Sequence, residues 1–455
     1  MSNIKLAASV IVTRRHGGLL QALLVRRAPE MRFFGGYWVF PGGNVNDSDR
    51  HAAEEPEDDV LRRCAIRELR EETGLESGPL QSVCRITTPP FYPVRFATRF
   101  FLTEIPAGVE PTLAGSELVE YGFFDPAEAV RVWERGAMEI APPVLFLLRE
   151  LARHGVKQFP AQAAASAATF EGAGVHPAYF SPGMFVAPLR TPTLPPATTT
   201  NTVIAGHKTL FVIDPATPEP AEQARLFHQM DKMQTEGACF REILLTHHHV
   251  DHVGAVNAVS RRYGLPVRAH ELTYDRVPGD YLRGAPLRDG DRIDLGFAPD
   301  GTPEWHLNVI HTPGHAVDHL CFIDSRYHAA VVGDMLSTMS TILIDPPEGH
   351  MRTYLDSLRR LLDVPMKTLI PAHGLAHRDG HALIREFLDH RRMREEQALA
   401  ALTETSLSVE TLVPAIYTTT PPEMFPYAAR SLLAELIKLR EDGLCTETAT
   451  GWRRI

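Results

Sequence analysis

The chain has few cysteines and no long apolar run, and these two absences narrow its class. Its 455 residues include five scattered cysteines without CxxC spacing, which excludes a disulfide framework and indicates reduced thiols in a cytosolic protein. No run of about eighteen apolar residues is present, so the sequence predicts no membrane span. The apolar stretch 6–13 runs into Arg14 and Arg15 without a small-residue cleavage site, which favours a first β-strand over a signal peptide.

Repeats, low-complexity tracts and an excess of positive charge are also missing. The formal net charge is −10 at pH 7, with 44% hydrophobic and 22% charged residues. This composition is ordinary for a globular protein, and the charge argues weakly against a chain whose main task is holding nucleic acid. A chain of this length has room for two or three domains.

The sequence changes character along its length and predicts three domains. Residues 1–154 mix strand-like and helical stretches. Residues 155–176 are rich in Ala and Gly without a clear amphipathic period, which favours a linker. Residues 177–378 alternate β-branched runs with helices, as layered α/β proteins do. Residues 379–455 are mostly helical.

Histidine and aspartate gather in four short motifs, each directly after an apolar, strand-like run. The densest is HHHVDH at 247–252, an HxHxDH pattern with three imidazoles and one carboxylate. Because loops at one sheet edge would bring such side chains together, we expect a single centre. Imidazole and carboxylate ligands without thiolate suit Zn²⁺ first, with Mn²⁺ or Fe²⁺ as alternatives. The candidate ligands are His247, His249, Asp251, His252, His315, Asp334 and His373.

These motifs resemble the metallo-β-lactamase superfamily over roughly residues 185–380. The resemblance implies an αβ/βα sandwich and a hydrolase with two metal ions, whose shared hydroxide attacks a (thio)ester or a phosphodiester. It implies that Asp251 also orients this hydroxide. The ligand sets it implies are His247, His249 and His315 for one ion and Asp251, His252 and His373 for the other, with Asp334 bridging them.

Departures from several branches of this superfamily narrow the options. Asp334 supplies a bridging carboxylate that true β-lactamases lack, and His249 stands where the flavodiiron branch has Glu. The 39 positions between Asp334 and His373 are too few for the cap of the large nucleases. Small (thio)ester hydrolases and compact nucleases remain.

Segments 198–206, 340–351 and 390–397 resemble the lactamase-β-like endoribonuclease branch. That branch ends in a small winged-helix-like domain, which matches the helical stretches and the short final hairpin expected within 408–455. In this part Ala428, Leu432 and Leu436 recur at helical spacing, which predicts core packing.

Three arginines in the third segment leave two interpretations open. Arg391, Arg392 and Arg394 could contact a phosphate backbone. Alternatively, they line a solvated helix face and pair with Glu395 and Glu396.

A carboxylate cluster near the N-terminus is the second chemical signal, in RELREETGL at 67–75. On a helix, Glu68, Glu71 and Glu72 fall at i, i+3 and i+4 and share one face, and Gly74 fits the helix end. Three convergent carboxylates suit Mg²⁺ or Mn²⁺, which bind diphosphate oxygens. The structural alternative is an exposed charged helix laced with Arg–Glu pairs.

Together with FPGG at 40–43, this string resembles the Nudix box, and the likeness covers about 5–154. It implies an α/β/α sandwich that cleaves a nucleoside diphosphate linkage. Glu68, Glu71 and Glu72 would hold Mg²⁺ or Mn²⁺, with Glu71 and Glu72 catalytic.

The Nudix pattern is interrupted. Asp59 stands where the box carries Glu, and residues 46–58 are extra after the glycines. This insertion, VFPGG and the segment 88–102 resemble the coenzyme A diphosphatase branch. Arg67 could orient one glutamate, and Glu117 or Glu120 could supply a further ligand or base.

The sequence therefore predicts a multidomain α/β and α+β hydrolase with two catalytic centres. The leading interpretation is a bifunctional enzyme acting on small molecules such as coenzyme A or nucleotide derivatives, with cleavage of a diphosphate linkage and of an acyl thioester. An RNA-processing endoribonuclease is the alternative. A third interpretation keeps the Nudix domain as a nucleotide sensor without turnover. The oligomeric state stays open.

Overall fold

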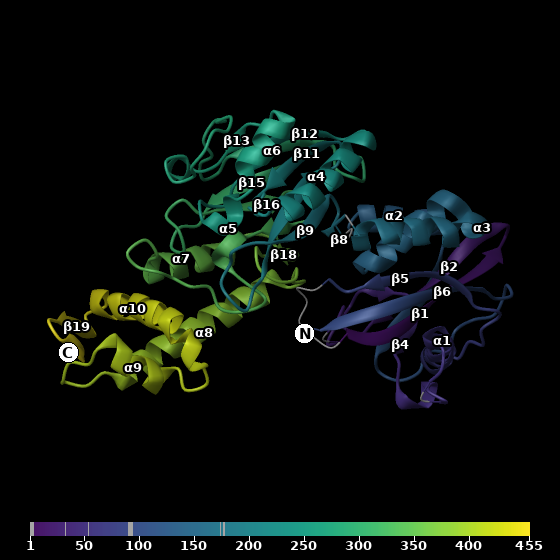
Figure 1. Ribbon diagram of the computed structural model, residues 1–455, viewed down its shortest axis with the longest axis horizontal. Coiled ribbons are helices and arrows are strands. Elements are labelled where there is room, and N and C mark those ends of the chain that lie inside the picture. The colour runs from purple at the N-terminus through teal and green to yellow at the C-terminus, as the bar shows by residue number, and fades with distance from the viewer. Residues whose placement is uncertain (1–3, 32, 53, 90–93, 173, 176–177) are drawn as a thin grey trace. The chain divides into compact units, whose positions relative to one another are not determined.

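The chain forms two compact units in the computed structural model, which Figure 1 traces from the N- to the C-terminus. None of the helices in the described part has the length and apolarity that crossing a bilayer requires. All five cysteines are free, which confirms the expected thiols. The described residues are 4–31, 33–52, 54–89, 94–172, 174–175 and 178–455, so the middle of the segment 88–102 lies outside them. The first unit comprises residues 1–187, 224–233 and 299–302, and the second comprises residues 188–223, 234–298 and 303–455.

The first unit is built on a seven-stranded sheet. Its order is β3-β2-β1-β6-β5, with β4 pairing on β1 and β7 on β2. The strands are β1 (Ile4–His16), β2 (Leu19–Arg27), β3 (Trp38–Val39), β4 (Gly42–Asn44), β5 (Gln81–Thr87), β6 (Arg95–Glu104) and β7 (Leu118–Phe124). The pairing of β1 with β6 is parallel, and β1 confirms the strand predicted over 6–13.

Two hydrophobic cores cover the two faces of this sheet. Ile11 of β1 lies in the core that contains α2 and α3, whereas Val10 and Val12 lie in the core that contains α1. This alternation is the period of two that a strand buried on both faces requires. Figure 1 shows α1 on one side of the sheet and α2 and α3 on the other, which confirms the α/β/α sandwich. The helices are α1 (Glu57–Thr73), α2 (Pro126–Glu134) and α3 (Pro142–Gly172), and η1 (Asp47–Asp49) is a short 3-10 turn.

Helix α1 forms where the carboxylate pattern predicts it. Leu61, Ala65 and Leu69 are fully buried at four-residue spacing, which fixes one face of the helix on the sheet. Acidic residues fill the first turn, where the helix dipole favours negative charge. Gly74 ends the helix at φ 66°, a left-handed conformation that glycine adopts without steric cost. Because one face is fixed, the direction of the acidic face is fixed as well.

The segment 155–176 is not a structureless linker in its described part. Helix α3 continues through it after a break at Gly155, where φ is 64° and ψ is 166°. Phe159, Ala163 and Ala167 are buried at four-residue spacing in the same core as α2. Alanine has the highest helix propensity, and this apolar stripe is the signal that the sequence interpretation missed. The expected linker conformation is wrong, while the domain boundaries remain predictions.

The second unit is layered around two sheets. In one, β10, β11, β12 and β13 are neighbours, and β11, β12 and β13 are parallel. The other has the order β14-β15-β16-β17-β18. Its strands are antiparallel apart from the β17–β18 pair. Helix α6 lies against β12, and α7 and α8 share a core with β16, β17 and β18. Figure 1 shows these helices outside the sheets, as the predicted αβ/βα sandwich requires.

The bounds of these elements follow the chain order. The strands are β8 (Ala178–Ser181), β9 (Met184–Arg190), β10 (Thr199–Gly206), β11 (Thr209–Ile213), β12 (Cys239–Leu244), β13 (Val267–Arg268), β14 (Arg292–Gly296), β15 (Trp305–His311), β16 (Leu320–Asp324), β17 (Ala329–Val331) and β18 (Thr368–Ile370). The helices are α4 (Pro220–Thr235), α5 (Val250–Val253), α6 (Val256–Tyr263), η2 (Glu271–Thr273), η3 (Gly333–Met335), α7 (Met351–Leu361) and α8 (Gly380–Ala401).

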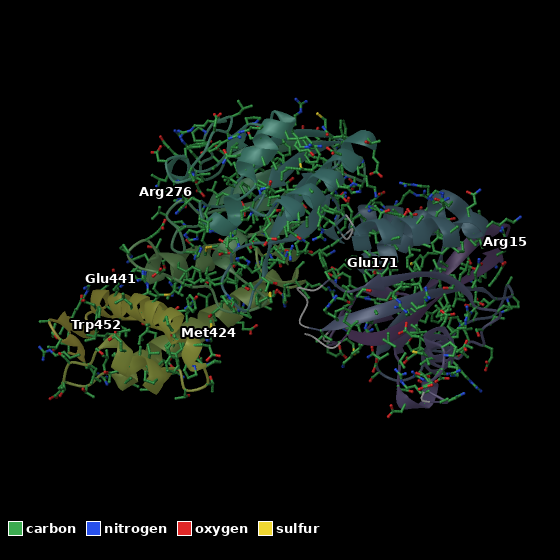
Figure 2. All side chains as sticks on the ribbon, in the orientation of Figure 1. Arg15, Glu171, Arg276, Met424, Glu441 and Trp452 are labelled. Atoms are coloured by element: carbon green, nitrogen blue, oxygen red, sulfur yellow. The ribbon has the colours of Figure 1, made fainter. Side chains whose placement is uncertain are left out.

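The C-terminal part is a small helical domain closed by a hairpin. Leu432, Leu436 and Trp452 are buried in one core, as the apolar spacing predicts. Figure 2 labels Trp452 in the hairpin and Glu441 at the end of α10. Its elements after α8 are α9 (Val409–Ile416), η4 (Pro422–Met424), α10 (Phe425–Glu441), β19 (Cys445–Thr448) and β20 (Gly451–Arg454). Ala434, on another face of α10, joins the core of α7 and α8.

Glu435 of α10 makes the stability of this region depend on pH. It is 1% exposed, and neither carboxylate oxygen has a hydrogen-bond partner. Burial raises the pKa of Glu435 from 4.5 to about 7, although the charge of Arg391 opposes this. The unfolded chain therefore ionises this group at lower pH than the folded chain, so the folded state loses stability as pH rises from about 4.5 to 7.

We expect Glu435→Gln to stabilise the chain by on the order of 2–3 kcal/mol at pH 8 and to have little effect at pH 4.5. Denaturant unfolding at the two pH values measures this difference. The matched control is Glu396→Gln, at an exposed position of α8, which should change stability little at either pH. Equal effects of Glu435→Gln at both pH values would contradict the assignment.

Candidate metal centres

The four histidine and aspartate motifs follow strands, but the strands belong to two sheets. His247 and His249 follow β12 of the first sheet, and Asp251 and His252 lie on α5. The remaining three candidates follow β15, β17 and β18 of the second sheet. The expectation of a single sheet edge is therefore wrong. The side chains meet because the ends of the two sheets lie together.

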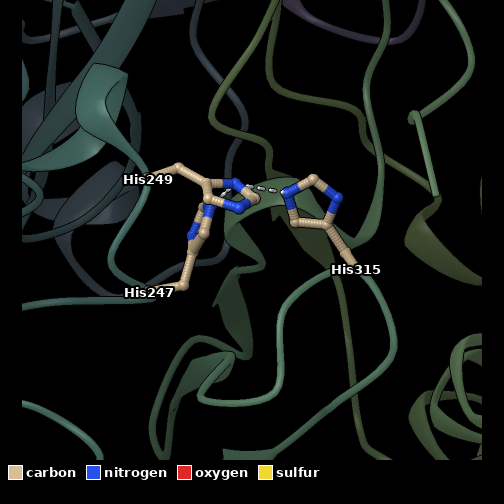
Figure 3. Close-up of side chains that lie close together, drawn as sticks. All are labelled: His247, His249 and His315. Carbon is tan, nitrogen blue, oxygen red and sulfur yellow. Dashed lines mark hydrogen bonds between the residues drawn. The ribbon is translucent and has the colours of Figure 1, made fainter. Parts of the chain in front are cut away.

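Three imidazoles form the first group, on the elements that follow β12 and β15. His249 Nδ1 lies 3.0 Å from His247 Nε2 and 3.0 Å from His315 Nε2. Figure 3 shows the three rings turned toward one another. Ring nitrogens this close repel as bare lone pairs unless a proton or a cation lies among them. The three ligand atoms have the mutual spacing that one metal ion requires.

A second group contains Asp251, His252 and His373, whose ligand atoms also lie within 4.8 Å of one another. Asp334 lies between the two groups. Its Oδ1 is 3.5 Å from His252 Nε2 and 3.2 Å from His373 Nε2, and its Oδ2 is 3.5 Å from His315 Nε2. One carboxylate thus turns one oxygen toward each group, which is the position a bridging ligand would take.

The outer ring nitrogens of four of these histidines are held by other residues. His315 Nδ1 lies 2.9 Å from the Leu343 carbonyl, and His373 Nδ1 lies 3.0 Å from the Thr199 carbonyl. Donation to these carbonyls leaves Nε2 as the acceptor that faces the centre. The other two outer contacts are His247 Nδ1 with Thr246 Oγ1 at 3.0 Å and His252 Nδ1 with Asp214 Oδ2 at 2.9 Å.

Asp214 is the most connected of these outer partners. It is 2% exposed, and it accepts hydrogen bonds from the Thr246 backbone N–H at 2.7 Å and from Thr246 Oγ1 at 2.6 Å. Because it also holds His252, we expect Asp214→Asn to lower zinc affinity about 10- to 100-fold. A competitive titration with a zinc chelator measures the affinity. Asp231→Asn, on α4, is the control, and equal affinity for the Asp214 variant would contradict this role.

Electrostatics fits this centre to a divalent cation. Burial and neighbouring imidazoles lower the pKa of His247, and they lower the pKa of His249 to about 2, so both rings are neutral. Burial opposes protonation of His252 and His373, but the charge of Asp334 outweighs it and raises both pKa values. Among the described residues, the buried His252 Nε2 and Asp334 Oδ1 have no hydrogen-bond partner. Neutral imidazoles and unpartnered acceptors are the donor set that Zn²⁺ prefers.

The carboxylate helix supplies the second candidate centre. The Gly42 backbone N–H donates to Glu72 Oε2 at 2.8 Å. The carboxylate of Glu68 lies 2.4 Å from the point where a Cβ on Gly43 would lie. The backbone therefore approaches Glu68 at a distance that only glycine permits. Glu71 is more open, with a side chain 59% exposed. In the described part of the chain, the three carboxylates are not as closely gathered as the histidine groups.

The structure favours Glu117 over Glu120 as the additional acid of this centre. Burial raises the pKa of Glu72 to about 7, and the negative charges of Glu68 and Glu117 raise it further. Glu120 instead pairs with Arg26, with Arg26 Nη1 and Glu120 Oε2 3.3 Å apart. Mutually repelling carboxylates beside a buried acid fit a site that gains from a divalent cation.

Known proteins match all three parts of the chain. The family described as Metallo-beta-lactamase superfamily matches residues 194–373. Lactamase-like protein nscB of Trichophyton verrucosum (strain HKI 0517) is 32% identical over 217 residues, which are 44% of this chain and 69% of that protein. The chain belongs to the metallo-β-lactamase superfamily. The NUDIX domain matches residues 3–145, and the Beta-lactamase associated winged helix domain matches residues 408–452.

Two further relatives agree with this assignment. Beta-lactamase-like protein 2 homolog of Drosophila melanogaster is 26% identical over 248 residues, which are 54% of this chain and 83% of that protein. The crystal structure of a Beta-lactamase domain protein from Burkholderia ambifaria shares the fold, at 20% identity and a TM-score of 0.52 over 62% of this chain and 94% of that one. The Nudix and metallo-β-lactamase families are hydrolases that use divalent metals, so this chain is a hydrolase.

The metallo-β-lactamase domain also contains site residues that sequence reasoning missed. Asp318 and His319 are fully buried beside the centre. The Asp334 backbone N–H donates to His319 Nε2 at 3.1 Å, which fixes the backbone of the carboxylate between the two groups. Asp318 Oδ1 lies 2.8 Å from His248 Nδ1, on the loop that carries two of the ligands. The signal in the sequence was an Asp-His pair only three residues after His315.

The three arginines considered as phosphate contacts are largely occupied within the fold. Arg391 is 3% exposed, donates to the Ile342 carbonyl and lies over the ring of Tyr354. Arg394 donates to the Ile416 carbonyl and lies 4.5 Å from the centroid of the Tyr417 ring. The structure therefore contradicts a phosphate-binding row. The alternative of pairing with Glu395 and Glu396 is also wrong in its partners, which are listed here: Arg392 pairs with Asp389, and Lys438 pairs with Glu395.

Proposed function

We propose that the metallo-β-lactamase domain is a dinuclear (thio)ester hydrolase and that the Nudix domain cleaves a nucleoside diphosphate linkage, as in coenzyme A derivatives. The observation that carries the first half is the position of Asp334, with one oxygen toward each of two ligand groups. A single-metal site has no use for a carboxylate placed in this way. Two Zn²⁺ ions suit the donor set, with Mn²⁺ or Fe²⁺ as alternatives.

Each residue of this centre has a distinct role in the proposal. His247, His249 and His315 would hold one ion, and the second group would hold the other. Such ions supply a hydroxide that is nucleophilic near neutral pH and positive charge that stabilises the developing oxyanion. Asp251, with Oδ2 3.5 Å from His373 Nε2, would orient the attacking oxygen by accepting its hydrogen bond. The buried outer partners would keep every ring in one tautomer.

The surroundings of the centre favour an acyl substrate over RNA. Val250, between the ligands His249 and Asp251, is 69% exposed and offers an apolar contact beside the reacting atoms. Arg391 and Arg394, the candidates for backbone phosphates, are turned into the fold. The chain as a whole carries a net charge of −10. An RNA substrate would need cationic groups that face outward beside the centre.

The Nudix half of the proposal rests on the acidic face of α1. Glu68, Glu71 and Glu72 would hold Mg²⁺ or Mn²⁺, which neutralises the diphosphate oxygens of a bound substrate. Glu72 is set for proton transfer near neutral pH because burial raises its pKa to about 7. Glu71 is accessible to solvent and would activate the attacking water.

Product identification by mass spectrometry tests both halves at once. Acyl-coenzyme A, free coenzyme A, ADP-ribose and a short single-stranded RNA would be offered to three proteins: the natural chain, Asp251→Ala/His252→Ala and Glu71→Gln/Glu72→Gln. We expect thioester cleavage to disappear only in the first variant and diphosphate cleavage to disappear only in the second. Each double variant is the control for the other centre.

The alternative functions give different results in the same experiment. RNA cut by the natural chain and spared by the Asp251/His252 variant, with the thioester intact, would move the domain to the nuclease branch. Nucleotide binding without turnover, unchanged in the Glu71/Glu72 variant, would make the Nudix domain a sensor.

A further inference from the structure

The insertion that interrupts the Nudix box is folded onto helix α1. Asn46 and Asp49 cap η1 reciprocally, since the Asn46 side chain accepts from Ser48 and the Asn46 backbone N–H donates to Asp49 Oδ2 at 2.9 Å. Arg63 of α1 donates to the Asp49 carbonyl at 2.7 Å and pairs with Glu55. The insertion is therefore a structured element tied to the helix that carries the candidate metal ligands.

At the centre of this arrangement Arg67 contacts three carboxylates. Its Nε and Nη2 donate to the two oxygens of Asp49, both at 2.8 Å. Its Nη1 donates to Glu68 Oε1 at 2.8 Å and to Glu71 Oε2 at 2.9 Å. A bidentate pair of this kind fixes the plane of a guanidinium as well as its position. With two edges fixed by Asp49, the remaining nitrogen is directed at both glutamates.

Asp49 is built for this contact. Its side chain is 2% exposed, against 17% for Arg67 and 59% for Glu71. Burial disfavours its charge, but the hydrogen bonds from Arg67 and from the Asn46 backbone keep the pKa of Asp49 below its usual value. Asp49 is therefore ionised at neutral pH, and its pair with Arg67 is the most buried of the three.

The acid that the Nudix pattern itself provides cannot make this contact. Asp59 and Arg67 both lie within α1 and are eight positions apart, which is about 12 Å along a helix at ~1.5 Å per residue. An aspartate side chain is too short to span this distance. In the described part of the chain, Asp59 is exposed and its carboxylate makes no hydrogen bond or ion pair.

We propose that Asp49, supplied by the insertion, is the positioning residue that directs Arg67 toward Glu68 and Glu71 and so sets the geometry of the metal-holding carboxylates. This inference rests on the proposed function of the Nudix domain. Without Asp49, the guanidinium is free to rotate toward both glutamates and to compete with a cation for their oxygens. The insertion would thus replace the interrupted part of the box.

Binding of Mn²⁺ to the zinc-loaded full chain, followed by electron paramagnetic resonance of free Mn²⁺, tests this role without relying on turnover. We expect Asp49→Asn to weaken Mn²⁺ binding about 10- to 100-fold, the usual effect of losing an outer partner of a ligand. Asp49→Glu should recover part of the affinity. Asp59→Asn, the matched control at the position of the box, should bind within about twofold of the natural chain.

A second control separates positioning from folding of the insertion. Arg63→Gln removes the other link between insertion and helix without touching Arg67, and it should retain Mn²⁺ affinity. The inference is overturned if Asp49→Asn binds like the natural chain, or if Arg63→Gln loses as much affinity as Asp49→Asn. If the natural chain itself binds no Mn²⁺ and cleaves no diphosphate, the proposed Nudix function fails first, and the inference fails with it.

Discussion

Asp334→Asn is expected to lower hydrolysis by the metallo-β-lactamase domain by more than about 100-fold, because even loss of an outer partner of a metal ligand costs about 10- to 100-fold. The asparagine keeps the shape of the side chain but removes the negative charge. In the natural chain His252 and His373 each lie within 3.5 Å of Asp334 Oδ1, and this charge is what raises the pKa of both. Without it, the two ligand groups share no anionic ligand, and the cationic pair of metals is no longer balanced.

Steady-state kinetics on the acyl substrate and elemental analysis of bound zinc measure this prediction together. The control is Asp324→Asn, which alters another buried carboxylate of the domain, one that accepts hydrogen bonds from Trp305 and the backbone of Tyr327. That variant should lose stability and keep its metals. An Asp334 variant with natural zinc content and activity within tenfold would show that the carboxylate does not act as a shared ligand.

Gly314→Ala is expected to destabilise the chain by roughly 3 kcal/mol and to weaken zinc binding as well. Gly314 has φ +131°, and a Cβ at this position would lie 2.3 Å from the backbone N and Cα of Tyr354 on α7. Helix backbone cannot give way as a flexible side chain can, so the loop must move. Overpacking costs about 1–3 kcal/mol and a disfavoured backbone conformation about 1–3 kcal/mol more. Since the next residue is the ligand His315, the displacement reaches the metal centre directly.

Gly290→Ala separates the two contributions. Gly290 also has positive φ, +83°, but its Cβ position is open, with no atom within 4 Å. Its variant should cost about 1 kcal/mol and leave zinc affinity unchanged, as measured by denaturant unfolding and zinc titration. If Gly314→Ala behaves like Gly290→Ala in both measurements, the close approach to α7 does not position His315.

The parts of this account that sequence reasoning predicted share one physical property, which is local encoding. The HxHxDH cluster and the acidic face of α1 lie within single short segments, so their spacing in the chain fixes their spacing in space. The burial of Leu61, Ala65 and Leu69 and the final hairpin follow for the same reason. The family resemblance then supplied the distant ligands His315 and His373.

What sequence reasoning missed depends on contacts between segments far apart in the chain. Asp214 lies 38 positions from His252, and Asp49 lies 18 positions from Arg67. No periodicity links either pair. The arrangement of the ligand strands in two sheets also could not be read from strands that look alike in sequence. The helix in 155–176 was the exception, because its Phe159, Ala163 and Ala167 stripe was visible and was outweighed by the Ala and Gly content.

Anomalous scattering at the zinc edge from crystals of the zinc-loaded chain tests the central claim most directly. The account predicts two peaks in the metallo-β-lactamase domain, one among His247, His249 and His315 and the other among Asp251, His252 and His373, with Asp334 in contact with both. A single peak, or peaks away from these residues in crystals of protein that still hydrolyses its substrate, would contradict it.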